Sequence, residues 1–85
     1  WEARAEAFEA DRAHLMRLNT EVIDPLAERL ARLERAFAAG LVPADRVVRA
    51  RRDHHEAEHQ RLELLARILA SQALAHATHR RLEAP

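Results

Sequence analysis

Apolar residues recur along both halves of the chain at spacings of three, four or seven, the pattern of amphipathic α-helices. This spacing predicts one helix over residues 2–39 and a second over residues 44–81. The stripe of the first half contains Trp1, Ala5, Phe8, Leu15, Leu18, Val22, Leu26, Leu30, Leu33 and Phe37.

The segment between the two helices carries the signals of a helix end and a new helix start. Gly40 is the only glycine and suits the left-handed position after a helix, with Leu41 as the apolar residue that folds back onto it. Pro43 suits a helix start, and Asp45 lies in the first turn, where the helix dipole favours an acid. We therefore expect a single domain over residues 1–85, a long antiparallel two-helix hairpin that turns at residues 40–43.

Asp24-Pro25 interrupts the first helix in one of two ways. The apolar stripe passes through it without losing phase, which favours one helix kinked at Pro25. Asp24 is also a good N-cap and Pro25 a good first helical residue, which favours two abutting helices.

The second helix carries two apolar stripes, and a helix that is apolar on two sides needs two neighbours. The first helix supplies only one, so we expect assembly into a four-helix bundle or a larger oligomer. We assign the first stripe to the face toward the first helix: Val48, His55, His59, Leu62, Leu65, Leu69, Ala73 and His76. The second stripe is assigned to an interface with another chain: Ala50, Ala57, Leu64, Ile68, Ala75 and Leu82.

Composition removes several functional classes. The 14 basic residues balance 14 acidic ones, so nucleic-acid binding through bulk charge is not expected. No apolar run approaches the roughly 18 residues of a membrane span, and no signal peptide is visible. Cysteine is absent, so disulfides and thiolate metal sites are excluded.

The segment from Arg52 to His59 concentrates histidine and acid. His55 and His59 are spaced i, i+4, so both rings can reach one cation, and Glu58 lies between them. Glu56 and His59 form the Glu-x-x-His pair that di-iron four-helix bundles use twice, with a Glu from each of the other helices. Two copies of the hairpin would supply two such pairs, with Glu21 and Glu28 as candidates for the remaining carboxylates. Mixed carboxylate and imidazole ligands suit iron or manganese.

A purely structural interpretation of the same segment stands beside this one. His55, Glu58 and His59 can form a polar layer, in which Arg29, level with His55, pairs with Glu58.

Arg52-Asp53-His54-His55-Glu56-Ala57-Glu58-His59, followed by Leu62-Glu63-Leu64-Leu65, resembles the metal-binding segment of encapsulated ferritins, and Glu21-Val22-Ile23-Asp24 resembles that family's first-helix metal site. The resemblance implies Glu21, Glu56 and His59 as iron ligands, and a helical hairpin whose iron-oxidising site forms only between subunits. This chain departs from the family in its longer intervening segment, in Pro25 and in its few aromatic residues.

A second resemblance points to a structural role. Trp1-Glu2-Ala3-Arg4-Ala5, and Leu30-x-x-Leu33-Glu34 leading to Gly40-Leu41-Val42, are similar to the helical N-terminal part of nitrile hydratase β-type subunits and their accessory relatives. In those proteins this part wraps a partner subunit and carries no metal ligand. The sequence thus supports two hypotheses: a ferritin-like protein that oxidises or sequesters iron at a subunit interface, or a non-catalytic helical subunit that dimerises or wraps a partner protein.

Overall fold

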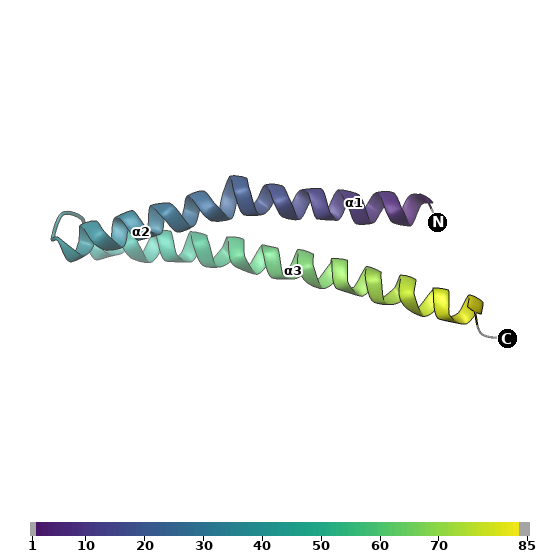
Figure 1. The fold of residues 1–85 in the computed structure, drawn as a ribbon. Helices are drawn as coiled ribbons and strands as arrows, with labels where there is room; N and C mark the ends of the chain where they lie inside the picture. The colour runs from purple at the N-terminus through teal and green to yellow at the C-terminus, as the bar shows by residue number, and fades with distance from the viewer. Residues whose placement is uncertain (1, 84–85) are drawn as a thin grey trace.

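The computed structural model describes the backbone of residues 2–83, with side chains for residues 5–78 and 80, and that part of the chain is helical apart from one turn. Three consecutive segments, α1 (Glu2–Arg17), the π-helix η1 (Leu18–Ile23) and α2 (Asp24–Ala38), form a first arm. After the turn, α3 (Ala44–Glu83) runs back beside all three segments (Figure 1). The predicted all-α class is confirmed.

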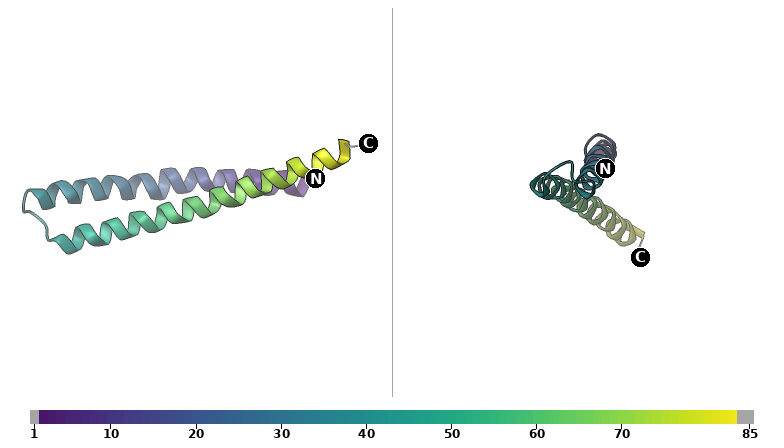
Figure 2. Two further views of the ribbon diagram at one scale, coloured as in Figure 1. Left: turned by 90° about the horizontal axis from the view of Figure 1, so that it is seen from below. Right: turned by 90° about the vertical axis from the view of Figure 1, so that its left-hand side faces the viewer.

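The molecule is a thin rod with a single layer of packing. Its principal extents are 69 × 18 × 13 Å and its radius of gyration is 19.2 Å, whereas a compact domain of this length has a radius of gyration of about 12 Å. The two arms separate toward the chain ends, where α3 diverges from α1 (Figure 2). Each arm therefore packs against one neighbour, and most of its circumference faces solvent.

The turn is held by a Schellman motif. Gly40 has φ +74°, its N–H donates to the Phe37 carbonyl at 2.9 Å, and the Leu41 N–H donates to the Ala36 carbonyl at 2.8 Å. The predicted left-handed role of Gly40 is confirmed. The predicted fold-back of Leu41 is wrong, because its side chain is 78% exposed.

Pro25 is accommodated without a break in the helical path. Its ring would collide with the carbonyl of Glu21, four residues earlier, in a regular α-helix. Residues 18–23 instead adopt the wider π-helix, and the Asp24 N–H donates to the Asn19 carbonyl, five residues back. Arg17, Ile23 and Asp24 all keep right-handed helical angles, so Asp24 is within the helix rather than an N-cap.

The π-helix changes which residues of the first arm face α3. Leu18 and Ile23 are five residues apart, yet both are buried, at 8% and 5% exposure. Val22, which the sequence pattern placed in the stripe, is 39% exposed, and Phe37 is 48% exposed. A π-turn contains more residues than an α-turn, so the buried face shifts by one position there.

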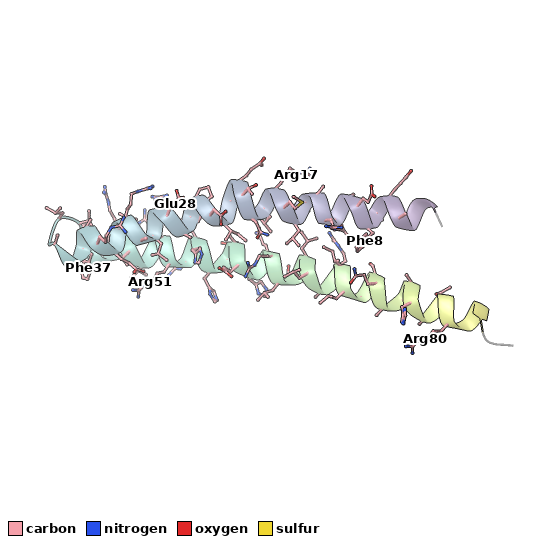
Figure 3. All side chains as sticks on the ribbon, viewed as in Figure 1. Phe8, Arg17, Glu28, Phe37, Arg51 and Arg80 are labelled. Carbon is pink, nitrogen blue, oxygen red and sulfur yellow. The ribbon has the colours of Figure 1, made fainter. Side chains whose placement is uncertain are left out.

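The core is small and lies between the arms. Leu18, Ile23 and Ala57 form its central cluster, with Leu26 packed against them, and Phe8 lies between α1 and α3 further out (Figure 3). The buried residues of α3, all at most 6% exposed, are Val47, Ala50, Ala57, Leu64 and Ile68. The assignment of the two stripes of the second helix was therefore reversed. The stripe with Ala50, Ala57 and Leu64 faces the first arm, because alanines let the two helices approach closely.

Within residues 2–83, no helix is both long enough and apolar enough to pass through a lipid bilayer.

Replacing Gly40 by Ala tests the turn. No atom lies within 4 Å of the added Cβ, so the cost is backbone strain alone, about 1–2 kcal/mol of unfolding free energy. Gly40→Asn, which tolerates the left-handed region, should lose much less. Urea unfolding followed by circular dichroism measures both, and equal losses would contradict the assignment.

A matched pair of leucines tests which face of α3 is the core. Leu64 is 5% exposed and Leu62 is 57% exposed. At concentrations too low for association, Leu64→Ala should cost roughly 2–5 kcal/mol and Leu62→Ala less than about 0.5 kcal/mol. Urea unfolding at high dilution measures both, and the reverse order would show that the face first assigned to the hairpin core is the buried one.

Candidate functional site

The face of α3 that points away from the first arm carries an unusual set of residues. We call it the outward stripe, and its members, all exposed, are Val48, Arg52, His55, His59, Leu62, Ala66, Leu69, Ala73 and His76. Their spacing alternates between three and four without interruption, the heptad spacing of a helix that packs along its length against another helix. Val48, Leu62 and Leu69 are 53%, 57% and 61% exposed.

This stripe is distinct from the one that packs against the first arm. The inward residues also alternate by three and four, through Val47, Ala50, His54, Ala57, Arg61, Leu64 and Ile68. If these are the a and d positions of a heptad, the outward stripe occupies positions b and f, which face solvent in a two-stranded pair. Leucine and valine at such positions indicate a second packing surface on α3.

The C-terminal third of α3 has almost no cover. Every residue from Leu69 to Thr78 is exposed, and Leu74 is 57% exposed. Figure 3 shows Arg80 on a part of α3 that projects away from the first arm. A helix without a neighbour is marginal in water, so this part of α3 gains little stability from packing within the described chain.

His54 and Arg61 of the inward stripe form a half-buried polar cluster with Glu58. The Glu58 carboxylate accepts a hydrogen bond from Arg61 at 3.0 Å and lies 3.3 Å from the His54 ring. The expected pairing of Arg29 with Glu58 is therefore wrong: both partners of Glu58 come from α3 itself, three and four residues away. The cluster forms a polar layer on the inward side of α3. Its ion pairs hold the Glu58 carboxylate there, away from His55 and His59 on the outward stripe.

The remaining candidate metal residues lie on the surface. His55 and Glu56 are exposed, and His59, also exposed, contacts Glu63 at 3.1 Å one turn further along. Glu21 lies in the π-helix and is exposed as well. Among the side chains that the structure describes, no group of three or more His, Asp or Glu residues could hold a metal ion. Glu21, Glu56 and His59 thus do not make an iron site within one chain.

The residues assigned to an interface between chains fall in different places. Ala57, Leu64 and Ile68 are buried within the hairpin, at 4%, 5% and 6% exposure, because they pack on the first arm. Ala75 is exposed on the uncovered end of α3. Leu82 lies outside the side chains that the structure describes.

Sequence reasoning missed that the outward stripe is the uncovered surface, although it found most of its members. The signal was present: Val47, His54 and Arg61 complete the inward alternation of three and four, so the other stripe has to point outward. His54 and Arg61 are polar, so this alternation does not appear as a continuous apolar stripe. A long arginine side chain can nevertheless bury its stem at such a position.

Comparison with protein families, with characterised proteins and with solved structures finds no match for this chain.

Hydrogen exchange tests the uneven cover of α3. At low concentration, the amides of residues 69–78 should exchange fastest within α3, and those of residues 50–68 slowest, because only the latter are held by packing. Mass spectrometry of peptides from the two regions measures the difference. Uniform protection along α3 would contradict the structure's account of this helix.

Proposed function

We propose that this chain is an assembly module, a helical hairpin that associates with a second copy of itself through the outward stripe of α3. The observation that carries the proposal is the heptad-spaced stripe on the uncovered side of that helix, which is apolar at Val48, Leu62, Ala66, Leu69 and Ala73. Two hairpins joined along this stripe form a four-helix bundle, in which each α3 has a neighbour on both of its apolar sides. The role is structural: the association of two hairpins brings two chains together.

The surface area of the chain agrees with this role. Its accessible surface is 6910 Å², whereas a compact monomer of 9.7 kDa exposes about 5,100 Å². The excess is roughly 1,800 Å², and a stable interface covers about 800 Å² on each partner. The rod therefore has enough surplus surface for a full interface without any change in its own fold.

The charges beside the stripe favour a second copy over an unrelated helix. Toward the turn the stripe is flanked by basic residues, including Arg49, and further along by the acids Glu56 and Glu63, all exposed. In an antiparallel pair related by a two-fold axis, the basic end of one α3 lies against the acidic middle of the other. Away from the axis, a surface with this arrangement is complementary to itself.

An iron site between chains is the second candidate function. The exposure of Glu56 and His59, next to the outward stripe, favours it, since both would lie at the edge of the proposed interface. Under this hypothesis the assembled protein would bind and oxidise or sequester iron, as the resemblance to encapsulated ferritins implies. It requires ligands from a second chain, because one chain does not gather them.

The proposal is tested by changing one leucine of the stripe. Leu62→Arg places a charge in the proposed interface and removes an apolar contact worth about 1.5–3 kcal/mol per chain. Sedimentation equilibrium should give twice 9.7 kDa for the unaltered chain and 9.7 kDa for the variant, with unchanged helicity by circular dichroism.

Leu74→Arg is the matched control for that experiment. Leu74 is as exposed as Leu62, at 57%, but it lies off the outward stripe, so this variant should remain a dimer. Equal loss of association in both variants would show that the stripe is not the interface. An unaltered chain that stays monomeric at high concentration would overturn the proposal, and association only with another protein would replace the second copy by that partner.

A further inference from the structure

Two histidines lie in the centre of the outward stripe. His55 and His59 are one helical turn apart, both are exposed, and His55 has no ion pair among the described side chains. Residues at this spacing have Cβ atoms about 5–6 Å apart on one face of a helix. On either side the stripe contains Arg52 and Val48 toward the turn, and Leu62 and Ala66 toward the C-terminus. A pair of imidazoles at the middle of a helix-packing surface needs a partner group once that surface is covered.

The proposed dimer brings four such rings together. In an antiparallel pair, residue numbers rise along one helix and fall along the other. Two residues that face each other across the pair therefore have numbers with the same sum in every layer. With the two-fold axis beside residue 57, Val48 faces Ala66 of the second copy, the stem of Arg52 faces its Leu62, and Arg49 lies near its Glu63. In the same register, His55 of each copy faces His59 of the other. The four imidazoles then occupy two adjacent layers at the axis.

We infer that a divalent cation of the zinc class binds between two copies of this chain, held by His55 and His59 of each. The inference rests on the proposed function, since the site exists only when two outward stripes meet. Four neutral imidazole nitrogens can form the tetrahedral environment that zinc prefers. An all-nitrogen set suits Zn(II), Ni(II) or Cu(II) and disfavours Mg(II) or Ca(II).

The charges around the axis favour a cation there. His59 contacts Glu63 through Nε2 at 3.1 Å, and a carboxylate beside a ligating histidine orients its ring, which leaves Nδ1 for the cation. The two copies of Glu56 approach each other near the axis in this register. Their repulsion disfavours the metal-free pair, and a dication between the chains relieves it. Without metal, the imidazoles and these acids make the centre of the interface its weakest part.

Zinc titration of the unaltered chain tests the inference. Sedimentation equilibrium with zinc and with chelator should show that zinc tightens the dimer, with one ion bound per two chains. A Co(II)-loaded sample should show the intense visible absorption of a tetrahedral site. One zinc per chain without any change in mass, or the weak bands of octahedral Co(II), would overturn the shared site.

Variants identify the ligands. His55→Ala and His59→Ala should each lower zinc affinity by at least about tenfold and remove the effect of zinc on the dimer, with helicity unchanged because both side chains are exposed. His14→Ala, an exposed histidine on the first arm, is the control and should respond to zinc normally. Glu56→Gln should still bind zinc at the shared site, with a smaller effect of zinc on the dimer because the metal-free pair is repelled less. Loss of binding in Glu56→Gln but not in His55→Ala would replace the four-histidine site by a carboxylate–histidine one.

The outcome separates this inference from the proposed function. If the chain dimerises in chelator, if Leu62→Arg abolishes the dimer and if zinc has no effect on it, the assembly role is supported and the metal site is ruled out. A chain that stays monomeric with and without zinc would lose both.

Discussion

Two helices side by side can hide only one face of each, and this limit determines the rest of the structure. The inward stripe of α3 is buried against the first arm, where Leu18, Ile23 and Ala57 pack together. No part of residues 2–83, as the structure describes them, covers Leu62 or Leu69 on the opposite side. The hydrophobic effect is proportional to the apolar area removed from water, so covering these leucines with a second copy, as we propose, would add stability.

The π-helix and the glycine turn keep the two arms in register. Pro25 would disrupt a regular α-helix through its ring and its missing N–H. The wider π-turn before it accommodates the proline and places Ile23 in the core. Gly40 reverses the chain within a few residues through its left-handed angle. Both features act on the backbone, and together they bring α3 back beside the first arm with its outward stripe uncovered.

The sequence predicted the features that depend on local chemistry and misjudged those that depend on packing. Helix type, the turn at Gly40 and the start of α3 follow from residue preferences within a few positions. Which stripe of α3 faces inward depends on how closely two helices approach, and Ala50 and Ala57 decide it only once both arms are placed. Ile23 rather than Val22 is buried because of the π-helix, and a pattern search based on the α-helical period of 3.6 residues does not predict a π-helix. The candidate metal residues were found as a group, but the pairing of Glu58 with Arg61 and the exposure of Glu21 and Glu56 needed the three-dimensional arrangement.

Under the proposed function, a second copy stabilises the fold that each chain already has. The most direct measurement is the thermal unfolding midpoint of the unaltered chain, followed by circular dichroism over a wide range of concentrations. If association stabilises the folded chain, the midpoint rises steadily with concentration, because mass action favours the dimer over two unfolded chains. A midpoint that is high and independent of concentration would show a self-sufficient monomer and contradict the account.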